Sequence, residues 1–415
     1  MKSDQFDDLK SRLGKVEWLV DEPDAGAIIT HFLRSPSECP PTLSHSQFSK
    51  LKKIANQEIA TILGRFCDDG AQLLNEIIVG DVPFPSPSNP KFRFIDLFAG
   101  IGGFRIAFQN AGGECVFTSE WDRFAKKTYE RNFGDIPFGD ITKIGECDIP
   151  DHEVLCAGFP CQPFSLAGVS KKNSLGRKHG FEDETQGTLF FDVKRIIAEK
   201  RPKAFMLENV KNLLSHDKGQ TFEVIRKSLE DDLGYIVKWK VVNGGNWVPQ
   251  RRERIFIVGF DPDQIIVDRD DIKIPERPSS DYLFPELNSI IEKEVEGHTL
   301  GPGTWDTLER HKANHEKKGN GFGYGLHLMP IQEGAYTRTI SARYHKDGAE
   351  VLIEQPGERP RRLTVKEAMS LQGYDPNKFV FPVSNTQAYR QIGNSVVVPA
   401  ISACALEIAQ KLVER

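Results

Sequence analysis

Short apolar runs alternate with amphipathic stretches over the middle of this sequence. The apolar runs predict buried strands at 92–98, 115–119, 154–157, 204–207, 236–242 and 254–259. Helical periodicity predicts helices between most of these strands, notably at 104–110, 123–132, 189–200 and 222–233. Such alternation is typical of a doubly wound α/β sheet, and we expect that architecture from about residue 91 onward.

The flanks of this region follow other patterns. Residues 1 to about 90 have helical periodicity at 6–19 and 46–63 and end in a linker rich in proline and serine. Residues 261 to about 340 are polar, glycine-rich and without helix–strand alternation, which predicts a small irregular domain or binding loops. We therefore expect four parts: an N-terminal helical accessory region (1–90), an α/β domain (91–260), an irregular region (261–345) and a C-terminal segment that returns to the α/β domain (346–415).

Composition restricts the class of protein. The chain has 415 residues, of which 39% are hydrophobic, enough for a sizeable core in two or three domains. No apolar run approaches the roughly 20 residues that span a membrane. The first residues lack the apolar core of a signal peptide. We therefore expect a cytosolic protein without membrane contact.

Cysteine and histidine spacing argues against a metal site. The seven cysteines are an odd number without a CxxC pair, which disfavours both a disulfide framework and a zinc cluster. His311 and His315 are four residues apart on a predicted helix, but no glutamate follows His311 as it does in zinc proteases. Solvent exposure is the better interpretation of this pair, and we expect no metal.

Basic residues are clustered although the net charge is −5. Local basic patches can bind phosphates on an acidic protein, because the potential depends on where the charges lie. Each patch alone could equally be a solvated face, and only convergence on one site would indicate a nucleic-acid groove. The three patches are Lys171, Lys172, Arg177 and Lys178; Arg251, Arg252 and Arg254; and Arg359, Arg361 and Arg362.

A cysteine and a glutamate follow two of the predicted strands. Cys161 stands after the run at 154–157 and Glu208 directly after the next strand, and open α/β sheets bind ligands at these carboxyl ends. Pro160 and Pro163 restrict the backbone around the cysteine and hold it on a rigid loop. The pair suggests an enzyme with a cysteine nucleophile, although Cys161 alone could equally be a small buried hydrophobe.

A glycine-rich turn at 99–103 joins the first strand to the first helix. Glycines allow close approach of a ligand, and the helix N-terminus offers free N–H groups, so a nucleotide-like cofactor is expected. A dinucleotide fingerprint fails because Arg105 occupies the third glycine position. Glu120 and the adjacent Trp121 end the next strand, which favours S-adenosylmethionine over NAD. Asp140 could accept a hydrogen bond from an adenine amino group or be an ordinary turn residue.

In this order, the segments resemble the C5-cytosine DNA methyltransferases, and in particular the bacterial Dcm-like enzymes of restriction-modification type. The resemblance runs from about Lys91 to the C-terminus and leaves the first ninety residues outside. It implies a Rossmann-like S-adenosylmethionine-dependent methyltransferase sheet, with 261–345 as target recognition region. The motifs that carry it are 94–103, Glu120-Trp121, Gly139-Asp140-Ile141, 158–165, Glu208-Asn209-Val210, 250–254 and Gly393-Asn394-Ser395-Val396.

The resemblance implies a covalent mechanism on a cytosine that is flipped out of duplex DNA within a short specific sequence. Cys161 would add to C6 of the ring, and C5 would then take the methyl group. Glu208 would hold or protonate N3, Arg254 would bind the base O2, and Arg252 would brace the site or a phosphate. Loss of the C5 proton would release Cys161 by β-elimination.

The resemblance also implies contacts to both ligands, for a monomer acting in the bacterial cytosol. S-adenosylmethionine, converted to S-adenosylhomocysteine, would lie against Phe98, Gly100, Gly102, Glu120, Trp121, Asp140, Ile141, Pro160, Leu189, Asn394 and Ser395. Double-stranded DNA would be contacted by Ser165, Lys171, Lys172, Arg177 and Lys178, from a loop that closes over the flipped base, and by Arg338 and Arg343.

Two alternatives stay open. An NAD-dependent oxidoreductase on the same sheet would bind nicotinamide and leave Cys161 and Glu208 structural. A non-catalytic DNA-binding protein with this fold, or a methyltransferase acting on RNA, would share most of the motifs. The presence of Cys161, Glu208 and Arg254 together argues against a protein without activity.

Overall fold

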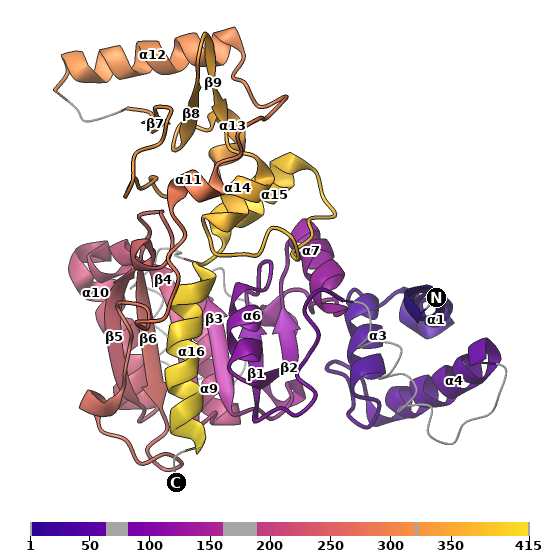
Figure 1. Ribbon diagram of the computed structural model, residues 1–415. Helices are drawn as coiled ribbons and strands as arrows, with labels where there is room; N and C mark the ends of the chain where they lie inside the picture. Colours follow the sequence, from indigo (N-terminus) through magenta and orange to yellow (C-terminus); the bar gives the residue numbers. More distant parts are fainter. Residues whose placement is uncertain (1, 64–81, 161–188, 320–322, 414–415) are drawn as a thin grey trace.

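A six-stranded sheet forms the centre of the chain (Figure 1). The computed structural model describes residues 2–63, 82–160, 189–319 and 323–413. The strand order is β2-β1-β3-β4-β6-β5, and each strand lies within a few residues of a predicted apolar run. The strands are β1 (Phe92–Leu97), β2 (Gly113–Ser119), β3 (Val154–Gly158), β4 (Ala204–Val210), β5 (Ile236–Asn243) and β6 (Glu253–Phe260).

Strand β6 runs antiparallel to both of its neighbours, β4 and β5, whereas β1 to β4 are parallel. The parallel arrangement predicted for the runs at 154–157 and 204–207 is confirmed, and β6 departs from it. The connection 244–252 is too short for the crossover of about a dozen residues that a parallel pair needs. The reversal places Arg254, near the start of β6, opposite Val210 at the end of β4.

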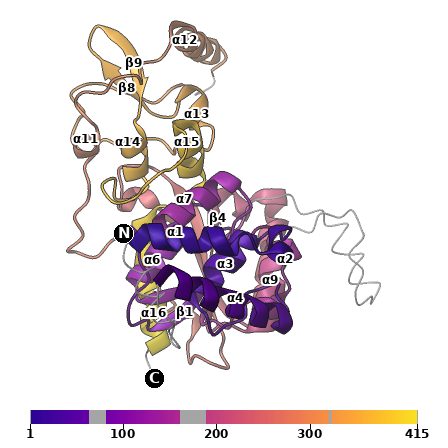
Figure 2. The ribbon, with the colours of Figure 1, turned by 90° about the vertical axis from the view of Figure 1, so that its right-hand side faces the viewer.

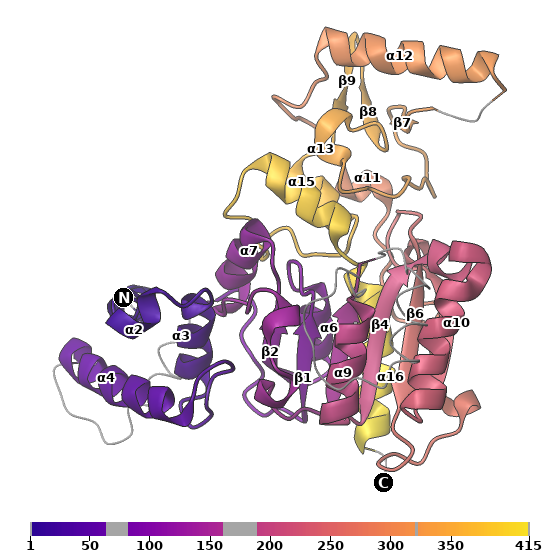
Figure 3. The ribbon, with the colours of Figure 1, turned by 180° about the vertical axis from the view of Figure 1, so that it is seen from behind.

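Helices cover both faces of the sheet, which confirms the predicted doubly wound α/β fold. They are α6 (Gly103–Asn110) and α16 (Val398–Val413) on one face (Figure 1), and α9 (Phe190–Lys200) and α10 (Gln220–Lys227) on the other (Figure 3). Successive side chains of a strand point to opposite faces. Cys156 and Met206 therefore join the core with α6 and α16, while Leu155 and Leu207 join the core with α9 and α10.

The N-terminal helices lie beside the β2 edge of the sheet (Figures 1 and 3) and face the viewer in Figure 2. They are α1 (Lys2–Leu13), α2 (Glu17–Val20), α3 (Ala25–Arg34) and α4 (His45–Leu63). The continuous helix predicted at 6–19 is wrong, because the chain leaves the helix at Gly14, a residue that disfavours helix interiors. Ile28 and Phe32 of α3 belong to the same hydrophobic core as Phe117 and Phe138.

A smaller lobe contains a three-stranded sheet in the order β7-β8-β9 (Figure 1). Its elements are α11 (Leu287–Ile290), α12 (Pro302–Lys317), β7 (Leu326–His327), α13 (Tyr344–Asp347), β8 (Leu352–Gln355), β9 (Glu358–Arg362), α14 (Val365–Ser370) and α15 (Asn385–Asn394). The region 261–340, expected to lack helix–strand alternation, contains α12 and β7. The helix predicted at His311 and His315 is confirmed as part of α12, although Leu308 is the one buried residue of that helix and no apolar stripe marks its length.

The last two helices connect the lobes. Among the residues described, no single helix is long and apolar enough to cross a membrane, and α15 and α16 pass that test only as a pair bent by 43°. α16 packs along α6 on the large sheet, whereas α15 lies beside α14 in the small lobe (Figure 1).

Candidate active site

A tight turn leads from β1 into α6 and forms one wall of a cavity. Phe98 and Gly100 both have positive φ, 57° and 55°, and Gly102 has φ of 84°. A Cβ atom at Gly102 would lie 2.2 Å from Cε2 of Phe133, so only glycine fits there. Phe98, a non-glycine residue in the left-handed region, is held in a conformation that such residues rarely adopt.

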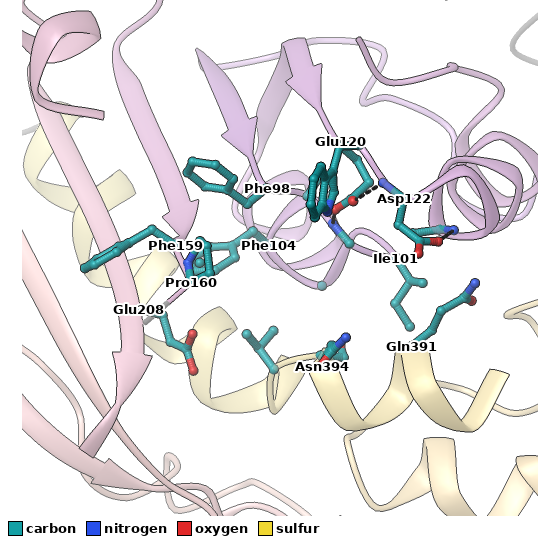
Figure 4. A pocket seen from close by; sticks show the side chains of 18 of the residues that line it. Phe98, Ile101, Phe104, Glu120, Asp122, Phe159, Pro160, Glu208, Gln391 and Asn394 are labelled. Carbon is teal, nitrogen blue, oxygen red and sulfur yellow. Dashed lines mark hydrogen bonds between the residues drawn. The ribbon is translucent and has the colours of Figure 1, made fainter. Parts of the chain in front are cut away.

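The cavity has a volume of about 790 Å³ and lies at the carboxyl ends of β1 to β4 (Figure 4). All of the residues predicted to contact the cofactor line it except Gly102, which packs behind the turn on α7 (Arg123–Phe133). The predicted residues that line it are Phe98, Gly100, Glu120, Trp121, Asp140, Ile141, Pro160, Leu189, Asn394 and Ser395. Residues far apart in the sequence therefore converge on one space.

Glu120 ties two loops of this cavity together. Its carboxylate accepts hydrogen bonds from the backbone N–H of Gly100 at 2.8 Å and from that of Asp122 at 2.7 Å. Burial raises the pKa of Glu120, and the hydrogen bonds from these two N–H groups oppose that shift. Each carboxylate oxygen can accept a further hydrogen bond, so the side chain can also bind ligand hydroxyls.

The loops after β2 form the end of the cavity beside Glu120. Trp121 is 83% exposed and offers an uncovered aromatic ring. Asp140 begins a short 3₁₀ helix, and its Oδ1 accepts from the N–H and the hydroxyl of Thr142, at 3.1 and 2.8 Å. The turn role considered for Asp140 is thus present, and its carboxylate also lines the cavity.

Glu208 lies at the other end of the same cavity (Figure 4). It lies within β4 and pairs in register with Gly158 of β3. Its Oε1 is 3.1 Å from Nε of Arg254, which reaches it from the antiparallel β6. Burial raises the pKa of Glu208, while Arg254 and Arg252 act in the opposite direction. A carboxyl that keeps its proton more readily than usual can donate that proton to a ligand.

Cys161 lies outside the described residues, as do the predicted DNA contacts Ser165, Lys171, Lys172, Arg177 and Lys178. The described chain leads from β3 to Pro160, which lines the cavity. The side chain of Asn209 donates a hydrogen bond to the carbonyl of Phe159 at 2.9 Å, so the end of β3 is fastened to β4. The position of the thiol beside Glu208 stays a prediction.

Arg252 is buried and holds three segments together. Its guanidinium donates to the carbonyls of Ile340, Gly393 and Ser395, at 3.0, 3.1 and 2.5 Å. Burial lowers its pKa to about 9, an effect that Arg254 strengthens and Glu208 opposes. Of the two roles considered for Arg252, this geometry matches bracing, because a buried side chain with carbonyl partners is not presented to a phosphate.

Helix α15 contributes cavity residues that sequence reasoning missed. Gln387, Arg390 and Gln391 line the cavity together with Asn394. Gln391 accepts a hydrogen bond from the hydroxyl of Thr128 at 2.8 Å. The spacing of three and four residues places these side chains on one face of a helix, and that spacing was the available signal. The predicted DNA contacts Arg338 and Arg343 are exposed in the small lobe, away from the cavity lining.

Asp96 is a fully buried carboxyl on β1, next to the glycine turn. Burial raises its pKa to about 8 from an ordinary value of 3.8. At pH values between 3.8 and about 8, this carboxyl is more often protonated in the folded state than in the unfolded state. Its contribution therefore destabilises the fold increasingly as the pH rises toward 8. We expect Asp96→Asn to lack this loss, so that its stability relative to wild type increases by about 2.5 kcal/mol between pH 6 and pH 8.5. Urea unfolding of both proteins at pH 6 and pH 8.5 measures their free energies of unfolding. A difference between variant and wild type that is the same at both pH values would contradict the prediction.

A sheet with a glycine turn after its first strand, an acidic residue after its second strand and a cavity across its carboxyl ends is typical of α/β enzymes that bind a nucleotide-type cofactor. Residues 92–410 match the family of C-5 cytosine-specific DNA methylases. The chain therefore belongs to this family, and it is a DNA-cytosine methyltransferase. The described residues contain no group of three or more His, Cys, Asp or Glu side chains that could hold a metal ion.

Similar proteins extend the comparison. The chain is 49% identical over 354 residues to the Type II methyltransferase M.SsoII of Shigella sonnei, covering 83% of this chain and 87% of that protein. It is 47% identical over 387 residues to the DNA-cytosine methyltransferase of Escherichia coli strain K12, covering 80% of each. The crystal structure of S. pombe Dnmt2 methyltransferase has the same fold, with a TM-score of 0.60 at 17% identity, over 78% of this chain and 98% of that one.

Proposed function

We propose that this enzyme transfers a methyl group from S-adenosylmethionine to C5 of a flipped cytosine in a short specific sequence of duplex DNA. The observation that carries the proposal is that one cavity holds Glu120 and Trp121 at one end and Glu208 with Arg254 at the other. A cofactor and a base bound at these two ends would meet between them. Cys161, the next residue in the sequence after Pro160, would form the transient bond to C6.

The residues of the cavity fit S-adenosylmethionine, which supplies an electrophilic methyl group when it is bound. The volume of the cavity, about 790 Å³, is in the range of roughly 300–1,000 Å³ common for small-molecule sites. Glu120 would accept from the ribose hydroxyls, and Trp121 and Ile141 would enclose adenine. Phe98 and Asn394 would lie along the remainder of the cofactor.

The chemistry of cytosine explains why a thiol and a proton donor are both needed. C5 does not attack a methyl group until the aromatic ring is disrupted, which addition of the Cys161 thiolate to C6 achieves. The ring then gains negative charge, and a proton held by Glu208 at N3 would offset it. The raised pKa of Glu208 supports this role. Arg254 would bind O2 of the base, and Arg252 would keep the floor of the site in place.

DNA would lie against the small lobe and the large sheet. We carry the four-part division over to the function: 261–345 would read the sequence, with the exposed Arg338 and Arg343 on phosphates or bases. The segment 346–415 would return the chain to the α/β domain through α16, after it has added β8, β9, α14 and α15 to the small lobe. Ser165 and the basic residues Lys171, Lys172, Arg177 and Lys178 would hold the backbone near the flipped base.

The biological setting that we infer is protection of DNA in the cytosol of a bacterium that carries a matching restriction enzyme. The support is the likeness to enzymes named Type II methyltransferases, including M1.ScrFI of Lactococcus lactis subsp. cremoris, 50% identical over 335 residues. We further infer that the enzyme acts as a monomer, because residues of a single chain line both the Glu120 end and the Glu208 end of the cavity.

Bisulfite sequencing of DNA from a host that expresses the protein tests the function, because it reports the modified base and its sequence context. We expect 5-methylcytosine at one short motif that is unmodified in the host without the gene. Transfer to purified duplex DNA should exceed transfer to single strands and to tRNA. If methyl transfer to tRNA is faster than transfer to duplex DNA, the substrate is RNA. If the protein binds NAD and does not bind S-adenosylmethionine, the oxidoreductase alternative is favoured.

A further inference from the structure

Helix α3 runs beside the segment 133–139, which leads into the cavity, and contacts it at successive turns. Near the C-terminal end of α3, Arg34 donates to the carbonyl of Phe133 at 2.9 Å and forms an ion pair with Asp135 at 2.7 Å. In the middle, the hydroxyl of Thr30 accepts from the N–H of Ile136 at 3.0 Å. Helix α3 is therefore hydrogen-bonded at several points to the segment that leads into the cavity.

At the other end of α3, Asp24 reaches the cavity wall. Asp24 occupies the N-cap position, where an aspartate usually accepts from N–H groups of its own helix. Here its side chain makes no such bond. Instead, its Oδ1 accepts from the backbone N–H of Gly139 at 2.9 Å and lies 3.5 Å from Nζ of Lys126.

Gly139 is the first residue of the cavity wall formed by 139–142. The residue before it, Phe138, exchanges backbone hydrogen bonds with β2: its N–H donates to Thr118 at 2.9 Å and its carbonyl accepts from Glu120 at 2.8 Å. The wall is thus held by β2 up to Phe138 and by Asp24 from Gly139 onward. A Cβ atom at Gly139 would lie 3.0 Å from Oδ1 of Asp24, so the absence of a side chain permits this contact.

We propose that Asp24 is a positioning residue of the cofactor pocket: it fixes the 139–142 wall, and with it Asp140 and Ile141, from a region outside the matched family segment of 92–410. The inference rests on the proposed binding of S-adenosylmethionine in this cavity. It assigns the N-terminal helices a part in cofactor affinity, while Glu208 and Arg254 at the other end of the cavity are left unaffected.

The test is the binding of S-adenosylhomocysteine to the full-length protein by calorimetry, together with KM for S-adenosylmethionine and kcat. Asp24→Ala leaves the Gly139 N–H without its acceptor, and we expect the Kd and KM to rise roughly tenfold with kcat within about twofold of wild type. Asp24→Asn keeps a carbonyl oxygen as acceptor and should recover most of the affinity.

Glu38→Gln is the matched control, because it removes one negative charge from the same region. Glu38 pairs with Arg93 at 2.8 Å, at the opposite end of β1 from the glycine turn. Its Kd should match wild type. Should Asp24→Ala not fold, Gly139→Ala tests the same contact from the other side, since the added methyl group would meet Asp24 Oδ1.

Wild-type affinity in Asp24→Ala, or equal losses in Asp24→Ala, Asp24→Asn and Glu38→Gln, would overturn the positioning role. Those results would leave the proposed function intact. If the wild-type protein itself does not bind S-adenosylhomocysteine, the proposed function fails, and this inference fails with it.

Discussion

Replacing Cys161 with serine is expected to lower methyl transfer to DNA by at least about a thousandfold while S-adenosylmethionine still binds. A serine hydroxyl is almost entirely protonated at neutral pH and does not add to C6, whereas a thiol is ionised in part and is intrinsically more nucleophilic. Transfer of a labelled methyl group to duplex DNA measures the rate, and calorimetry measures cofactor binding.

The control for this substitution is Cys147→Ser. Cys147 is exposed, contacts Glu199 and does not line the cavity, so its loss should leave the rate near wild type. Duplex DNA with 5-fluorocytosine at the methylated position should trap a covalent conjugate with wild type and Cys147→Ser, but not with Cys161→Ser. Substantial turnover by Cys161→Ser, or no conjugate from active enzyme, would remove the proposed nucleophile.

Glu208→Gln is expected to slow turnover by about two to four orders of magnitude with DNA affinity largely kept. Glutamine has nearly the same shape, but it cannot give a proton to N3 of the base. Because burial raises the pKa of Glu208, its protonated form persists to higher pH than usual, and the wild-type rate should fall as pH rises through that pKa. Single-turnover rates across pH measure both effects.

The matched control is Glu253→Gln on the neighbouring strand. Glu253 is exposed and pairs with Lys211 at 2.9 Å, an ion pair that contributes little. This variant should retain the wild-type rate and pH profile. A near-normal rate for Glu208→Gln would show that Glu208 does not act on N3. The same conclusion would follow if the rate of Glu208→Gln still fell at high pH as the wild-type rate does.

The sheet was predictable because its strands are short apolar runs with both faces buried. The place of β6 between β4 and β5 was not, since an apolar run carries no sign of its partner. Glu208, expected after a strand, lies inside β4 because it pairs with Gly158 of β3, and pairing with β6 extends β4 to Val210. The antiparallel pairing of β6 with β4 also brings Arg254 to Glu208, a contact that no local pattern contains.

The lining of the cavity was predictable residue by residue where a motif was present, as for Glu120 and Asn394. Gly102 carries the same motif but serves the packing of the turn against Phe133, a distinction that depends on tertiary contact. Gln391 was missed because it precedes the Gly393 motif on α15. Which face of that helix lines the cavity is set by the fold and not by the local sequence. The role of Asp24 was equally hidden, because its partner is a backbone N–H distant in sequence.

The burial of α3 against β2 has a consequence for handling this enzyme. Ile28 and Phe32 share a core with Val116 and Phe117, and β2 is the outermost strand on that side. A chain shortened to the homologous segment would expose the apolar side chains that α3 covers, such as Val116 and Phe117, and an exposed apolar patch favours aggregation. We expect such a fragment to accumulate as inclusion bodies, and the full-length chain to be the minimal soluble unit.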